Sequence, residues 1–132
     1  MADKKEIIIN GNNFSNLEEF YNEIDRVLTK ELDFKTGHNL NAFNDLLRGG
    51  FGVHEYDEPI HLKWENSQKS KLDLGYNATL NFYTEVLEKC HPSNINSVKK
   101  KIELAKAKEG QTLFDILVEI IMETDNCTLT LL

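Results

Sequence analysis

The segment of residues 37–50 contains the side chains best suited to bind another molecule. Asn39 is a favourable N-cap residue and Gly49 a favourable residue just past a helix end, so the sequence predicts a helix of about three turns between them. The polar side chains of this helix are three and four residues apart, and they therefore share one side of it, opposite an apolar stripe. They are Asn41, Asn44, Asp45 and Arg48. We interpret this side as a recognition surface; the alternative is an ordinary solvated helix face.

The histidine and cysteine side chains do not follow the pattern of a catalytic or metal site. No glycine-rich phosphate loop, nucleophile elbow or metal-ligand spacing surrounds them. Cys90 lies on an apolar helical stripe and His61 lies within a predicted strand, so packing explains both positions better than catalysis does. We therefore predict that the chain is not an enzyme and needs no metal or cofactor, with a histidine or cysteine catalyst as the competing hypothesis.

The charge balance argues against nucleic acid as a direct ligand. The chain of 132 residues has a formal net charge of -7, whereas phosphate binding requires a cationic surface. Residues 73–111 contain six lysines against five acidic residues, so the acidic excess lies in the remainder of the chain. An acidic body of this kind suits a cationic protein partner and speeds its approach.

The composition also predicts a cytoplasmic location without a membrane segment. Residues 1–6 are charged where a signal peptide would turn apolar, and no apolar stretch approaches the roughly 20 residues that cross a bilayer. Cys90 and Cys127 are the two cysteines of the chain, and without an export signal we expect them to be free thiols.

The periodicity of the apolar residues predicts strands that alternate with helices. Residues 7–9 are a continuous run of isoleucines, which is typical of a strand covered on both faces. Residues 73–111 are expected to form two amphipathic helices that break at Pro92 and pack on the body as a hairpin. The other predicted elements are helices at 17–32, 40–48, 67–72 and 113–123 and strands at 60–64 and 127–132. Because strands separated by helices pair in parallel, the predicted fold class is α/β, with a small three-stranded parallel sheet packed against helices and an added helical hairpin.

Four blocks of sequence resemble the barstar family, which comprises intracellular inhibitors of a secreted bacterial ribonuclease. They are residues 4–11, 37–49, 59–71 and 127–132, and their order and spacing make the resemblance cover roughly residues 4–72 and 113–132. The resemblance implies one barstar-like domain over residues 1–132. It also implies that residues 73–111 are a helical insertion, because the short form of the family has no counterpart for them.

The resemblance implies inhibition by occlusion, in which acids on the second helix and the preceding loop replace RNA phosphates in the nuclease active site. Asp45 aligns with the most important of these acids. Asn41 stands where the family has a second acid, Asn44 and Gly50 where it has tryptophans, and Lys35 where it has a tyrosine. These differences remove large aromatic anchors and one charge, so the resemblance implies a target other than the family's own nuclease.

A further family acid lies on the last helix, and its counterpart here depends on the alignment. Matching the apolar positions of that helix places Glu123 there, whereas aligning back from Cys127 without a gap places Ile121 there, a poor fit for a solvent-facing acid. We prefer Glu123; the alternative is an ordinary exposed residue near a helix end. The predicted partner-binding residues are Lys35, Asn39, Asn41, Asn44, Asp45, Arg48, Gly49 and Glu123.

The resemblance and the charge pattern together predict a bacterial, cytoplasmic immunity protein that neutralises a toxin. Its expected partner is a basic ribonuclease domain, bound by a monomer of this chain, with no direct contact to nucleic acid or membrane. The alternative is a barstar-fold adaptor whose partner is not a nuclease, since a fold alone does not fix a function.

Overall fold

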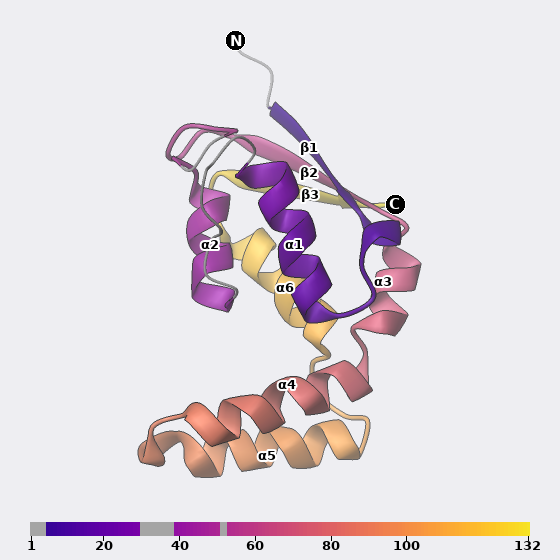
Figure 1. The fold of residues 1–132 in the computed structure, drawn as a ribbon, viewed down its shortest axis with the longest axis vertical. Helices are drawn as coiled ribbons and strands as arrows, with labels where there is room; N and C mark the ends of the chain where they lie inside the picture. Colours follow the sequence, from indigo (N-terminus) through magenta and orange to yellow (C-terminus); the bar gives the residue numbers. More distant parts are fainter. Residues whose placement is uncertain (1–4, 30–38, 51–52) are drawn as a thin grey trace.

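The computed structural model contains the three-stranded parallel sheet that the sequence predicts (Figure 1). The structure describes residues 5–29, 39–50 and 53–132. The strands are β1 (Lys5–Asn10), β2 (Ile60–Glu65) and β3 (Cys127–Leu131), in that spatial order. Ile7 pairs with Leu62, and Leu62 pairs with Leu129. Helices connect the strands, as parallel pairing requires, and the predicted α/β class is therefore confirmed.

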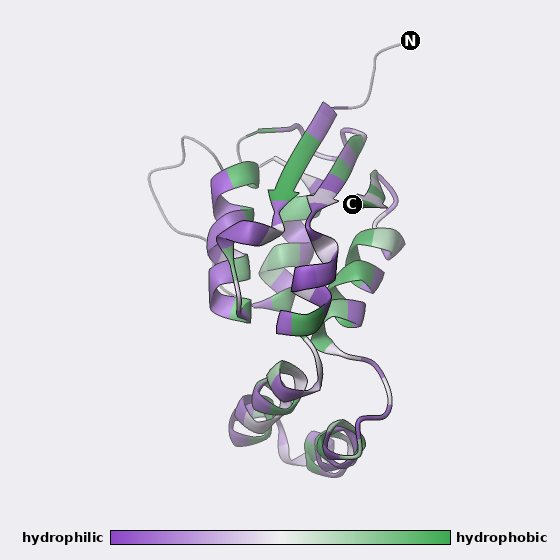
Figure 2. Cartoon of the chain, turned by 90° about the vertical axis from the view of Figure 1, so that its right-hand side faces the viewer, coloured by the Kyte–Doolittle hydropathy of each residue, from purple (hydrophilic) through white to green (hydrophobic). Residues whose placement is uncertain are grey.

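Burial alternates along β1, because the described helices cover one face of the sheet. Ile7 is 6% exposed and Ile9 is fully buried, whereas Ile8 between them is 47% exposed. Successive side chains of a strand point to opposite faces, so Ile8 lies on the open face together with Lys63, its partner on β2. The expectation that the isoleucine run is covered on both faces is therefore wrong. Figure 2 shows this run as a continuous hydrophobic stretch of β1.

The core is built around aromatic rings that hold α2 against the body. The helices of the body are α1 (Leu17–Leu28), α2 (Leu40–Arg48), α3 (Ser67–Asp73) and α6 (Leu113–Glu123). Phe20 of α1 stacks on Trp64 of β2 with ring centroids 5.4 Å apart, and it meets Phe43 of α2 edge-on at 5.3 Å. Phe43 and Leu47 are 1% and 0% exposed, so the apolar stripe of α2 lies in the core and its polar side faces outward.

A buried carboxylate joins α1 to the short 3-10 helix η1 (Gly11–Asn13). Glu23 is 3% exposed and accepts hydrogen bonds from the Arg26 guanidinium, the Asn10 N–H and the Asn13 side chain. Burial alone would raise the pKa of the Glu23 carboxyl, but these hydrogen bonds and the charge of Arg26 outweigh it, so the pKa is lowered. The group therefore stabilises the fold in its charged form.

Residues 76–106 form the predicted helical hairpin, which is attached to the body at one end. Its helices are α4 (Tyr76–Lys89) and α5 (Ile95–Lys106), with the 3-10 helix η2 (Pro92–Asn94) between them. Thr79 Oγ1 accepts a hydrogen bond from the Leu113 N–H at 2.6 Å, and the Phe114 N–H donates to Leu74 O at 3.0 Å. The hairpin therefore packs on the body near the start of α4 and extends away from there, as Figures 1 and 2 show.

Candidate functional site

The two ends of α2 are set by the residues that the sequence indicates. Asn39 Oδ1 accepts a hydrogen bond from the Ala42 N–H at 2.8 Å, which caps the start of the helix. Gly49 ends it with φ of +98°, and its N–H donates to Leu46 O at 3.1 Å. A Cβ atom at position 49 would lie 2.2 Å from Glu55 O, so the position requires glycine. Both predicted helix ends are confirmed.

The carboxyl end of α2 is held to the sheet through one carbonyl oxygen. Leu47 O lies 3.0 Å from His54 Nε2, 2.9 Å from Asn126 Nδ2 and 3.6 Å from Cys127 Sγ. Asn126 Nδ2 also donates to Glu58 O at 3.0 Å, so it links α2, the loop of residues 53–59 and the start of β3. Burial raises the pKa of Cys127 to about 11, with Arg48 opposing the shift, and the thiol is therefore protonated at neutral pH. These contacts satisfy a helix-end carbonyl and fix the orientation of α2.

Asp45 lies on the outward side of α2 and is exposed. Within the described parts of the chain, no cation lies within ion-pairing distance of its carboxylate. It lines a small hollow of about 380 Å³ together with Arg48, Gly49, Gly50 and Tyr56, which we call the Asp45 hollow. The described residues therefore do not neutralise this carboxylate.

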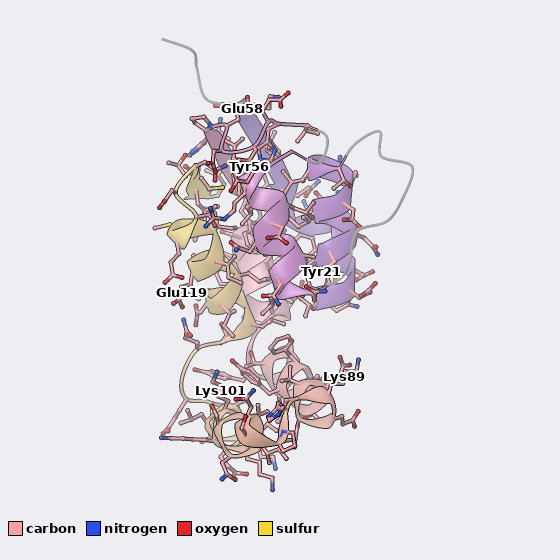
Figure 3. The ribbon with its side chains drawn as sticks, turned by 90° about the vertical axis from the view of Figure 1, so that its left-hand side faces the viewer. Tyr21, Tyr56, Glu58, Lys89, Lys101 and Glu119 are labelled. Carbon is pink, nitrogen blue, oxygen red and sulfur yellow. The ribbon has the colours of Figure 1, made fainter. Side chains whose placement is uncertain are left out.

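Tyr56 is a candidate site residue that reasoning from the sequence missed. The residue is 65% exposed, and its Cβ lies 3.9 Å from the position a Cβ would take on Gly50. The neighbouring residues Glu55 and Asp57 are exposed acids, and Glu58 Oε1 accepts a hydrogen bond from the Glu55 N–H at 2.8 Å. Figure 3 shows Tyr56 at the end of α2 that lies away from the helical hairpin, with Glu58 beyond it. The signal available in the sequence was an aromatic residue among three acids, Glu55, Asp57 and Glu58.

Asn44 connects α2 to the end of α6. A hydrogen bond of 3.2 Å joins Thr124 Oγ1 to Asn44 Oδ1, and the same hydroxyl lies 2.7 Å from Ile120 O. Asn44 is partly buried, whereas Glu123, the last residue of α6 and the neighbour of Thr124, is exposed. The end of α6 therefore lies beside α2, and it carries Glu123 as an exposed acid. Its role in binding stays a prediction.

The remaining predicted residues divide between two places. Asn39 and Asn41 are exposed and line a second, larger hollow between the amino ends of α1 and α2 and the helix α4. Lys35 lies outside the residues that the structure describes. The predicted set is therefore split along α2, with Asp45, Arg48 and Gly49 at its carboxyl end and the two asparagines at its amino end.

The structure also places the side chains considered for catalysis. His61 lies on the open face of the sheet, with Nδ1 2.6 Å from Thr128 Oγ1 and Nε2 2.9 Å from Thr130 Oγ1. Cys90 is half-buried at the end of α4, so its predicted core position is only partly realised.

Nowhere in residues 5–29, 39–50 and 53–132 do three or more His, Cys, Asp or Glu side chains gather in a group that could hold a metal ion. None of the helices described there has the length and apolar character needed to cross a membrane.

Comparison with known protein families identifies a match over most of the chain. A family model described as Barstar (barnase inhibitor) matches residues 4–105. The matched range contains β1, α2, the loop that carries Tyr56 and most of the helical hairpin. No curated protein matches the chain.

Proposed function

This chain belongs to the Barstar family, and we propose that it is an immunity protein that inhibits a cognate toxin ribonuclease by occluding its active site. The observation that carries the proposal is the Asp45 carboxylate, which is exposed beside a hollow on a rigidly held helix. The proposed binding surface consists of the residues that line the Asp45 hollow and the exposed acids next to them. The Asp45 carboxylate of this surface enters the nuclease active site.

The physical basis of inhibition is substitution of a carboxylate for a phosphate. A ribonuclease gathers cationic side chains to bind RNA, so the Asp45 carboxylate meets charge-assisted hydrogen-bond donors that are already assembled. Those donors offset the cost of removing the carboxylate from water. The contacts of Leu47 O and the backbone of Gly49 hold α2 in place before binding, which reduces the entropy lost on association. The net charge of -7 accelerates the approach of a basic partner.

The proposed target is a ribonuclease other than barnase. Asn41, Asn44 and Gly50 stand where the family resemblance implies an acid and two tryptophans, so a barnase-shaped partner would lose these contacts. Tyr56 offers a different aromatic side chain beside Asp45. Glu123 is the proposed second acid, and the protein is proposed to act as a non-catalytic cytoplasmic monomer that binds one toxin.

The proposal is tested with the purified product of the neighbouring gene, because immunity genes adjoin the toxin genes that they neutralise, and with barnase as a second probe. Cleavage of a fluorogenic oligoribonucleotide and calorimetric titration measure inhibition and Kd. Asp45→Ala is expected to cost about 2 to 5 kcal/mol, or roughly 30-fold to several thousandfold in Kd, because the partner's cations lose their counter-charge.

The matched control is Glu65→Ala. This substitution removes an exposed acid at the carboxyl end of β2, whereas the loop that carries Tyr56 leads into the other end of the strand. It reproduces the change in net charge and is expected to leave Kd within about twofold, since distant surface charges act mainly on the rate of association. Equal Kd values for Asp45→Ala and the wild type would show that the site is wrongly placed.

A barstar-fold adaptor for a partner that is not a nuclease is the second candidate. Asn41 and Asn44 favour it, because an amide in place of an acid or an aromatic ring weakens a site designed for phosphate mimicry. Tight binding of the neighbouring gene's product without any loss of its RNA cleavage would select this candidate.

A further inference from the structure

A hollow of about 650 Å³ lies between α4 and the amino ends of α1 and α2. We call it the α4 groove. Its apolar lining consists of Leu17, Leu40, Ala78, Phe82, Val86 and Leu113. Two of the residues that line it are Tyr21 on the body and Lys89 on the hairpin, both labelled in Figure 3.

The groove is open because α4 packs in two directions. Near its start, Thr79 bonds to the first turn of α6, and this holds α4 to the body. On its α5 side, Tyr83 lies under Lys101, whose Nζ is 5.5 Å from the ring centroid. Phe82 and Val86 occupy the intervening side of α4 one and two turns beyond Ala78, and both are only half-buried. The distal part of α4 therefore presents an apolar stripe to the groove.

The groove is continuous with the proposed nuclease-binding surface. Asn39 and Asn41 of α2 line it, and Asn41 lies one helical turn before Asp45. A partner that contacts Asp45 along α2 therefore reaches the groove without leaving the helix. Protein interfaces derive most of their affinity from a few apolar or aromatic anchors in well-packed pockets. The Asp45 hollow offers one aromatic ring, Tyr56, whereas the α4 groove offers six apolar side chains.

The rim of the groove indicates the charge of its occupant. Among the described residues, the exposed Glu85 carboxylate lies at this rim one helical turn before Lys89, and the chain as a whole has a formal net charge of -7. Burial, together with the Glu18 carboxylate, raises the pKa of Tyr21 to about 12, and the phenol in the groove is therefore neutral. An apolar side chain that carries or adjoins a positive charge matches both the lining and the rim.

We infer that the α4 groove is a second part of the toxin-binding surface and receives an apolar or aromatic side chain of the nuclease, with a neighbouring Lys or Arg facing Glu85. This inference rests on the proposed function, because it takes the nuclease to be the occupant. It assigns the helical hairpin a binding role that is separate from the phosphate-mimicking role of Asp45.

The first test fills the groove. Asn81 is an exposed residue of α4 that lines it, and Thr84 is exposed on the same helix outside it. Asn81→Trp is expected to raise Kd for the neighbouring gene's nuclease by about tenfold or more, whereas Thr84→Trp changes Kd by less than about twofold. Circular dichroism and thermal unfolding of both variants check that the hairpin is folded.

The second test reverses the charge of one rim residue. Glu85→Lys and Glu88→Lys alter the net charge equally and lie on the same helix, but Glu88 is exposed outside the groove. Glu85→Lys is expected to weaken binding by roughly three- to tenfold more than Glu88→Lys does, because it places like charges together at the rim. Both tests apply to the full chain and its unmodified partner.

The outcomes separate the two proposals. If Asp45→Ala weakens binding while Asn81→Trp and Glu85→Lys match their controls, the inference about the groove is overturned and the proposed function stands. If the wild-type chain neither binds nor inhibits the nuclease, both fail. A concentration-dependent dimer in light scattering that Asn81→Trp dissolves would assign the groove to a second copy of this chain and would also overturn the inference.

Discussion

Replacing Gly49 by alanine tests whether α2 and the loop that carries Tyr56 form one rigid unit. Gly49 has φ of +98° and ψ of -171°, a backbone conformation essentially restricted to glycine, which costs another residue about 1 to 3 kcal/mol. An added Cβ would also lie 2.2 Å from Glu55 O and 2.7 Å from His54 Cδ2. His54 and Glu55 cannot move freely, because His54 Nε2 bonds to Leu47 O, so the collision adds about 1 to 3 kcal/mol.

Gly50 provides the matched control. It also has a positive φ, +87°, but among the described residues that are not its chain neighbours the atom nearest to an added Cβ is Tyr56 Cβ at 3.9 Å, which is ordinary contact. Gly50→Ala therefore carries only the conformational cost of about 1 to 2 kcal/mol. The two substitutions are expected to differ by about 2 to 3 kcal/mol in the free energy of unfolding, or roughly 10 °C in Tm for a domain of this size.

Urea unfolding measures this difference through the fluorescence of Trp64, the single tryptophan, which is fully buried. Linear extrapolation gives each free energy of unfolding, provided that circular dichroism shows the same transition. Equal unfolding midpoints for Gly49→Ala and Gly50→Ala would refute the reasoning, because the close approach of Glu55 to α2 would then carry no energetic weight.

Three further predictions concern groups away from the Asp45 hollow. The lowered pKa of Glu23 means that its stabilising effect is complete above its ordinary value near 4.5 and is lost as the pH falls through the lower value of the folded state. Glu23→Gln is therefore expected to lose about 1 to 3 kcal/mol at pH 7 and to narrow its deficit in acid, measured by urea unfolding at several pH values; a deficit that does not change with pH would contradict this. Cys90 is expected to react with Ellman's reagent in the native protein at pH 8 while Cys127, buried and with a pKa of about 11, reacts only on unfolding, so two equally fast thiols would count against the packing of β3 on α2. Thr79→Val leaves the first N–H of α6 unpaired and is expected to destabilise the protein by about 1 to 3 kcal/mol, whereas Thr84→Val on the exposed side of the same helix stays near neutral, and thermal unfolding that ranks them the other way would disprove the anchoring role of Thr79.

Much of the fold could be predicted because its signals are local. Asn39 and Gly49 set the ends of α2 through bonds to residues only three positions away, so the sequence alone contains the partners. The helical hairpin followed from apolar spacing and one proline. The isoleucine run of β1 was misread, because a short apolar run does not show whether a second layer covers the strand, and Ile8 lies on the open face.

The candidate site divides in the same way. The sequence determined a capped, amphipathic helix with an outward Asp45, because capping and periodicity depend on neighbours along the chain. Only the tertiary structure placed Tyr56 beside Asp45, bonded Thr124 at the end of α6 to Asn44, and formed a groove between α4 and α2. These relations join residues separated by long stretches of sequence, and they arise from how helices pack on one face of a sheet, which no local pattern specifies.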